Sequence, residues 1–217
     1  MQLGDVITEA RILLQDTNTS YQRYSDSDLL GFANQALRRI AVLRPDLFSY
    51  FGAIDCLAGT VIQSLPSDAI RLMEVFSVVG GGAVRETNRE TMDDTYPTWV
   101  SETAGPAVNW MRHPRSQTKF FIYPQAPANQ QLVVEYAQAP STYEADEPVD
   151  LLPDAYYPVV LDGVIFLAES IDNEHVNAGR AELFQRSFAE ALAANMQARE
   201  LTDKERSAVE EKNEKAR

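Results

Sequence analysis

The residues whose types could perform chemistry are few in this sequence and stand far apart. The single cysteine, Cys56, excludes a disulfide within the chain and a cysteine-based zinc site, and its place in an expected strand favours core packing over reactivity. Two histidines are too few for a histidine metal cluster, and we assign His113 to a turn and His175 to the first turn of a helix. The acid pairs at 93–94 and 210–211 are typical of a solvated surface. We therefore predict no catalytic residue, no metal ligand and no cofactor.

Sequence motifs of nucleotide binding and hydrolysis are also missing. The glycine run at 80–82 lacks the lysine and the helix that follow a phosphate-binding loop, so we interpret it as a turn. The sequence contains neither the G-x-S-x-G motif of hydrolases nor the H-E-x-x-H motif of zinc proteases. Tyr96, Trp99 and Trp110 have no basic groove beside them, which favours core or sheet packing over base stacking. The chain is not expected to be an enzyme.

The charge of the chain is strongly acidic and uneven. The sequence holds 19 Lys and Arg against 32 Asp and Glu, for a formal net charge of −13. Residues 120–179 contain no Lys or Arg, and the segment 144–154 is the densest acidic part. This balance argues against a protein that grips nucleic acid by its phosphates, but not against one that stands beside it. For the acidic segment, a solubilising loop and a surface close to DNA or to a basic partner both stay open.

The sequence gives no sign of a membrane segment. The first residues lack the basic region and apolar stretch of a secretory signal. The most apolar stretch, 158–171, is interrupted by Asp162 and Glu169, so we expect no membrane contact.

Apolar spacing predicts helices at both ends of the chain. Residues 3–14 and 25–44 show the i, i+3, i+4 pattern of one buried helix face, with Ser25 as N-cap and Pro45 after the end. A second pair is predicted over 155–171, with Asp154 as N-cap, and over 174–201, with Asn173 as N-cap. The expected stripes include Leu13, Ile171 and Leu183. Residues 202–217 are too charged to form a core and predict a tail.

Between the helices the period changes to two, which predicts strands. Residues 51–57 and 60–65 flank a turn and are expected to form a hairpin, and residues 70–79 are expected to turn back into 83–87. Further strands are predicted over 108–112, 118–123 and 131–138, and a short helical turn between 89 and 99. Leu72 and Val75 should point to opposite faces of their strand.

Because the four helical stripes can bury one another only if the two ends of the chain meet, the predicted class is α+β. We expect a four-helix unit from residues 1–46 and 151–201, and an inserted antiparallel β sandwich or barrel over 47–150. Residues 202–217 form the expected charged C-terminal arm.

Several motifs in order along nearly the whole chain resemble the head-to-tail adaptor, or connector, family of tailed phages. The resemblance extends to proteins similar to the tail tubular protein A of short-tailed phages. The motifs are Leu13-Leu14-Gln15-Asp16-Thr17, Arg23-Tyr24-Ser25, Asp28-Leu29-Leu30, Asn34-Gln35-Ala36, Arg44-Pro45-Asp46-Leu47-Phe48, Leu65-Pro66, Tyr123-Pro124, Leu152-Pro153-Asp154-Ala155-Tyr156, and the pair Phe184 and Phe188.

The resemblance implies a structural virion protein at the head–tail junction. Such a protein is a subunit of a ring, commonly of twelve copies, that docks on the portal protein and receives the tail nozzle or tail tube protein. Double-stranded DNA passes through the ring without specific binding. A soluble acidic binding module or DNA mimic acting on a host protein, and a tail-completion ring protein, stay open as alternatives.

Two groups of candidate site residues follow from the resemblance. The acids that would line the channel are Glu144, Asp146, Glu147 and Asp150. The arm would order on the portal or on a neighbouring subunit, although a merely solubilising end is the alternative. Its candidate binding residues are Leu201, Lys204, Arg206, Val209, Lys212 and Arg217.

Overall fold

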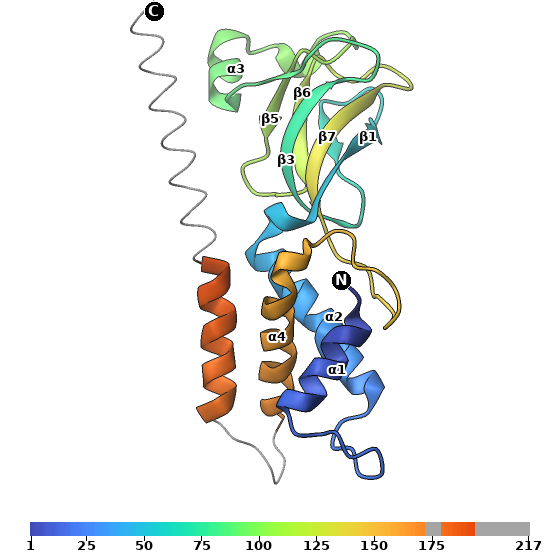
Figure 1. Cartoon of the computed structure of the whole chain (residues 1–217). Coiled ribbons are helices and arrows are strands. Elements are labelled where there is room, and N and C mark those ends of the chain that lie inside the picture. The colour runs from blue at the N-terminus through green and yellow to red at the C-terminus, as the bar shows by residue number, and fades with distance from the viewer. Residues whose placement is uncertain (172–178, 194–217) are drawn as a thin grey trace, which may run out of the picture. The chain divides into compact units, whose positions relative to one another are not determined.

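The computed structural model describes residues 1–171 and 179–193 and divides the chain into two compact units (Figure 1). We call Met1–Leu43 together with the chain from Ser141 onward the helical unit, and Arg44–Pro140 the β unit. Residues 141–150, which the strand pattern assigned to the β part, group with the helical unit. The predicted mixture of α and β structure is confirmed.

The described part of the helical unit contains α1 (Leu3–Leu13), α2 (Asp26–Leu43), α4 (Tyr157–Glu169) and a helix over residues 179–193. Helix α4 contacts both α1 and α2 and buries residues around most of its circumference. Each fully buried Leu, Ile or Val contributes about 1.5–3 kcal/mol, so these stripes hold the unit together. Of the predicted stripe of α2, Leu30 is only half-buried, and the other positions are buried: Leu29, Ala33, Ala36, Leu37, Ile40 and Ala41.

The start of α2 has the predicted cap. The Asp28 backbone N–H donates to the Ser25 hydroxyl at 3.1 Å, and the Ser25 backbone N–H donates to the Asp28 carboxylate at 3.1 Å. These two bonds satisfy backbone donors that a helix start leaves without partners. Two hydrogen bonds lower the pKa of Asp28: the larger effect comes from the Ser25 hydroxyl and the smaller one from the Ser25 backbone N–H.

The cap predicted at Asp154 is wrong. A short 3-10 turn, η3 (Asp154–Tyr156), precedes α4, and the side chain of Asp154 caps no backbone N–H there. Its carboxylate instead accepts from the Met1 amino group at 2.5 Å. The cap predicted at Asn173 lies outside the described residues.

Three positions of the predicted stripes are exposed. Leu13 and Ile171 lie at helix ends and are 39% and 41% exposed, and Leu183 is 64% exposed. In the helix over 179–193, the buried residues are Ala181, Phe188 and Leu192. The buried face of this helix is therefore narrower than the apolar stripe predicted for it. Val176 and Met196 lie outside the described residues.

The β unit holds two sheets. One has the strand order β1 (Ser49–Asp55), β7 (Gln131–Gln138), β3 (Ala69–Val78). The other has the order β2 (Ile62–Ser64), β6 (Lys119–Tyr123), β5 (Asn109–Arg112), β4 (Arg85–Glu86). All pairs are antiparallel except β4 with β5. The short helix α3 (Arg89–Thr95) and the turns η1 (Pro45–Phe48) and η2 (Trp99–Ser101) complete the unit.

The hairpin predicted between residues 51–57 and 60–65 is wrong. β1 pairs with β7 and β2 pairs with β6, so these neighbouring strands belong to different sheets. The turn at the glycine run is confirmed: the Val78 N–H donates to the Gly82 carbonyl at 3.0 Å, and Gly80 has a φ of 70°. After this turn, however, β4 joins the second sheet.

The strict alternation predicted for residues 70–79 is also wrong. Three register shifts interrupt the pairing of β3 with β7. A bulge adds a residue on one strand and rotates the side chains that follow. Leu72 and Val75 therefore both enter one hydrophobic core, together with Ile54, Trp110, Phe120, Ile122, Leu132 and Val134.

Candidate functional site

The four acids proposed from the sequence lie on one exposed loop between β7 and α4. We call residues 144–150 the acidic loop; its side chains Glu144, Asp146, Glu147 and Asp150 are all exposed. The first residues of the chain fix its backbone. The Gly4 N–H donates to the Ala145 carbonyl at 2.7 Å, and the Val149 N–H donates to the Met1 carbonyl at 2.9 Å. The loop is thus held by its backbone, which leaves most of its side chains free to face solvent.

The turn at the tip of the acidic loop is closed from within. The Glu147 N–H donates to the Glu144 carbonyl at 3.2 Å, and the Glu144 N–H donates to the Glu147 carboxylate at 3.1 Å. Glu147 therefore has a structural role in the turn. A Cβ at Gly4 would lie 3.0 Å from the Ala145 carbonyl oxygen, so glycine permits the close approach of α1 to this turn.

An amide from α2 anchors the chain just before the acidic loop. Asn34 is 4% exposed; its side chain donates to the Tyr143 carbonyl at 3.0 Å and accepts from the Tyr143 N–H at 2.8 Å. Arg38, one turn further along, donates to the Thr142 hydroxyl at 2.7 Å. The sequence interpretation missed Asn34 as a support. The available signal was a polar residue within the apolar stripe of α2.

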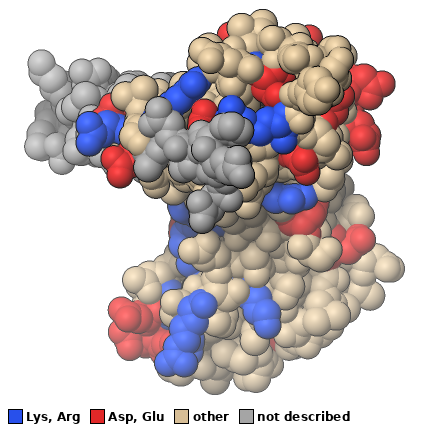
Figure 2. All heavy atoms as spheres, turned by 90° about the horizontal axis from the view of Figure 1, so that it is seen from below, with Lys and Arg blue, Asp and Glu red and all other residues tan. Residues whose placement is uncertain are grey.

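The acidic loop presents a local negative charge. Within the part of the chain that the structure describes, none of its four carboxylates forms an ion pair with Lys or Arg. Such charge acts on a solute within about 8–10 Å at physiological salt. On the face of the molecule seen in Figure 2, Asp and Glu side chains are interspersed with Lys and Arg side chains. The negative net charge of the chain therefore does not make this whole face acidic.

The candidate arm residues lie outside the part of the chain that the structure describes. These residues are Leu201, Lys204, Arg206, Val209, Lys212 and Arg217. The histidine at position 175, His175, also lies outside the described residues.

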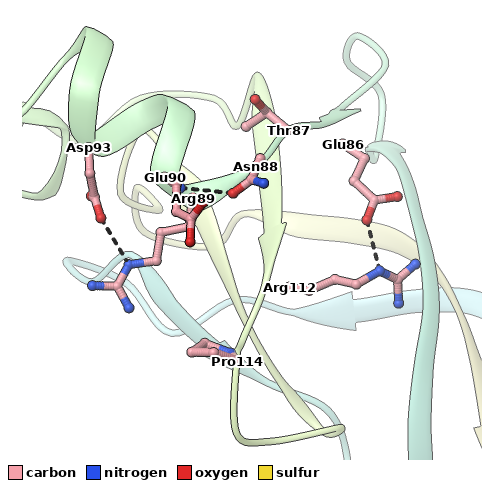
Figure 3. Close-up of a pocket in the computed structure, with 8 residues that line it drawn as sticks. All are labelled: Glu86, Thr87, Asn88, Arg89, Glu90, Asp93, Arg112 and Pro114. Carbon is pink, nitrogen blue, oxygen red and sulfur yellow. Dashed lines mark hydrogen bonds and ion pairs between the residues drawn. The ribbon is translucent and has the colours of Figure 1, made fainter.

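The β unit has a pocket of about 570 Å³ beside α3, and four of its five charged side chains form two ion pairs (Figure 3). Arg112 lies 2.8 Å from the Glu86 carboxylate, and Arg89 lies 3.3 Å from the Asp93 carboxylate. Asp93 also accepts from the Trp99 indole N–H at 2.8 Å. These partners fix the side chains in place, and the pocket brings together no nucleophile with a base.

The other residues that could perform chemistry serve as packing groups. Cys56 is half-buried, and burial raises the pKa of its thiol, which disfavours the reactive thiolate. The His113 ring stacks on Phe121 with centroids 5.2 Å apart, and its Nδ1 accepts from the Arg115 N–H in the predicted turn. Trp99 and Trp110 are buried, as predicted, whereas Tyr96 is exposed and packs edge-on against Tyr123.

Residues 1–171 and 179–193, which the structure describes, show neither a metal cluster nor a membrane-spanning helix. Among them, no group of three or more His, Cys, Asp or Glu side chains is arranged to hold a metal ion. Over these same ranges, none of the helices combines the length and the apolar character that crossing a bilayer requires.

Comparison with known families gives one assignment. The family model described as SU10 adaptor protein matches residues 1–210, which include both units. No curated protein matches the chain. The match supports the prediction of a phage adaptor with a structural role in the virion. It does not confirm the predicted similarity to tail tubular protein A. The chain belongs to the SU10 adaptor protein family.

Proposed function

We propose that the protein is a ring-forming head-to-tail adaptor that connects the portal protein to the tail nozzle or tail tube protein. The observation that carries this proposal is the family match over residues 1–210, because it includes the elements of both units. In this proposal the helices at the two ends of the chain act as one four-helix scaffold, and the two sheets of the β unit act as a sandwich inserted into it. Twelve copies would surround the DNA path at the head–tail junction.

The acidic loop supplies the second part of the proposal, which is a channel that DNA passes without adhering. The acids of residues 144–150 are exposed, and no Lys or Arg occurs anywhere in residues 120–179. Negative charge beside the path repels the phosphates of DNA and prevents the counterion release that drives tight binding. The backbone bonds from Gly4 and Met1 support this role, because they hold the charge at a fixed place.

The proposed contact with the portal involves the arm, residues 202–217. A segment that orders on binding can cover a large surface at modest affinity. The test is co-sedimentation of the chain with portal rings purified from the same phage. Three proteins are compared: the full chain, a chain that ends at residue 201, and a chain in which residues 202–217 are scrambled at constant composition.

We expect the full chain to co-sediment and both altered chains to bind at least about tenfold more weakly, a loss of about 1.4 kcal/mol. If the full chain does not co-sediment with portal rings, the proposed adaptor function is wrong. Binding that is equal for all three proteins would leave the adaptor function standing and reject the arm as its contact.

A further inference from the structure

A cluster of cations on the β unit has no role in the arrangement described so far. We call Arg71, Arg112 and Lys119 the basic patch; with Leu72, His113, Ser116 and Gln117 they line a depression of about 170 Å³. No carboxylate lines this depression. In a chain of net charge −13, three cations at one depression mark a place where an anion would be favoured.

The basic patch is rigid because the loop between β5 and β6 is fastened to β3. The Leu72 N–H donates to the Gln117 carbonyl at 2.8 Å, and Arg112 donates to the Met73 carbonyl at 2.9 Å. Arg112 also forms an ion pair with Glu86, so its positive charge is partly neutralised. The patch therefore offers a preformed surface whose edges come from strands of both sheets.

Three cations at this surface are exposed and available. Arg71, Lys119 and the neighbouring Arg115 are exposed, and none forms an ion pair with a residue that the structure describes. The acidic loop shows the opposite condition, with four exposed carboxylates and no cation partner among the same residues. The two surfaces belong to different units of the chain.

We propose that the basic patch binds the tip of the acidic loop, Glu144 and Asp146, of a second copy of this chain. The contact is heterologous, because it joins two different surfaces, and repeated heterologous contacts close into a ring when the rotation between copies permits. This inference rests on the proposed adaptor function and names one contact that would build the ring. Asp150, which follows the tip, remains for the channel.

Charge complementarity favours a second copy over DNA as the occupant. Three exposed cations would neutralise few phosphates, and the rest of the acidic chain would repel the duplex. Each exposed ion pair contributes only about 0.2–1 kcal/mol, so the contact needs several pairs and should weaken steeply with salt.

The test is a charge exchange followed by sedimentation velocity of the full chain. The patch variant carries Arg71→Glu and Lys119→Glu, and the loop variant carries Glu144→Lys and Asp146→Lys. The loop variant keeps Glu147, because that carboxylate closes the turn. A control carries Arg23→Glu and Arg85→Glu, two exposed cations outside the patch that undergo the same change of charge. Circular dichroism checks that every variant is folded.

We expect the unaltered chain and the control to self-associate at low salt and to dissociate in about 1 M salt, where the screening length falls to about 3 Å. Each charge-reversed variant alone should associate at least about tenfold more weakly, because like charges then face each other. An equimolar mixture of the two variants should regain association, because each then offers the surface that the other needs. A contact within one chain could not give that recovery.

Three results would overturn the inference. The first is an unaltered chain that stays monomeric at low salt at its highest soluble concentration. The second is a mixture that associates no better than its components. The third is loss of binding to a labelled DNA duplex in the patch variant with unchanged self-association, which would make the patch a nucleic-acid site. None of these depends on portal binding, so failure here and failure of the adaptor function are distinguishable.

Discussion

At the scale of single residues, a buried arginine organises the turn between α1 and α2. Arg11 is 9% exposed and donates to the Asp16 carboxylate at 2.8 Å, to the Tyr24 carbonyl at 3.0 Å and to the Asp26 carboxylate at 2.6 Å. Asp16 is also buried and accepts from the backbone N–H groups of Arg23 and Tyr24. The sequence predicted only a polar turn here, because the partners of Asp16 depend on how the turn folds back.

The two carboxylates on Arg11 should differ strongly in their effect on stability. Asp16→Ala removes the buried carboxylate from Arg11, which keeps Asp26 and the Tyr24 carbonyl, and leaves the N–H groups of Arg23 and Tyr24 without their acceptor. We expect a loss of about 1–3 kcal/mol in the free energy of unfolding of the helical unit. Asp26→Ala removes an exposed partner of the same arginine and should cost less than about 1 kcal/mol.

Urea unfolding followed by far-ultraviolet circular dichroism measures both losses. Fluorescence provides an internal control, since the only two tryptophans, Trp99 and Trp110, lie in the β unit. Equal losses for the two substitutions would contradict the assignment of Asp16 as the buried partner.

At the scale of elements, two glycines inside helices have opposite environments. A Cβ at Gly163 in α4 would lie 2.8 Å from the Ala36 Cβ and 3.1 Å from Phe188, so this glycine lets three helices approach one another. A Cβ at Gly31 in α2 would meet nothing within 4 Å. The same substitution should therefore change stability in opposite directions at the two positions.

Gly163→Ala should destabilise the helical unit by about 1–3 kcal/mol, because the added methyl group overpacks the contact between α2 and α4. Gly31→Ala should stabilise it by about 0.5–1 kcal/mol, because alanine loses less backbone entropy on forming a helix. Thermal unfolding followed by circular dichroism measures both. Stabilisation of the chain by Gly163→Ala would show that the helices are not this close.

The elements show which information a sequence carries. The stripe of α2, its Ser25 cap and the exact limits of β7 were predictable, because periodicity and capping act over a few residues. The partners of β1 and β2 were not, because pairing is decided by strands far away in the sequence. The bulges of β3 likewise depend on its partner β7, so Leu72 and Val75 could not be assigned to one face.

The same distinction holds for the candidate site. Composition alone located the acidic loop, since it lies in the longest stretch without Lys or Arg. Its supports could not be found that way, because Asn34 and Gly4 reach it across more than 100 residues of sequence. The basic patch was hidden for the same reason: Arg71 and Lys119 come together only when β3 and the loop before β6 are joined.

At the scale of the whole molecule, the acid that follows the tip of the acidic loop should affect the passage of DNA. We expect phage particles carrying Asp150→Asn to release DNA about twofold to fivefold more slowly, because one repulsive charge of about 1 kcal/mol is removed from the path. Glu182→Gln on the helix over 179–193 forms a matched control that removes the same charge elsewhere.

DNA release triggered in purified particles, followed with a fluorescent dye, measures the effect. Electron microscopy of the same particles checks that heads and tails are still joined. An unchanged rate in joined particles would reject the acidic channel, and an equal slowing in the control would assign the effect to net charge rather than to position.

The β unit is one continuous segment, whereas the helical unit is built from two separated ones. A ribosome therefore completes residues 44–140 before it has made the residues that cover α1 and α2. While the β unit folds, the apolar stripes of those two helices emerge with their α4 partner still unsynthesised. A nascent chain whose residues 44–140 have just left the ribosome would thus combine a complete β unit with two helices whose apolar faces are uncovered, and we expect chaperones to bind near its beginning rather than at its growing end.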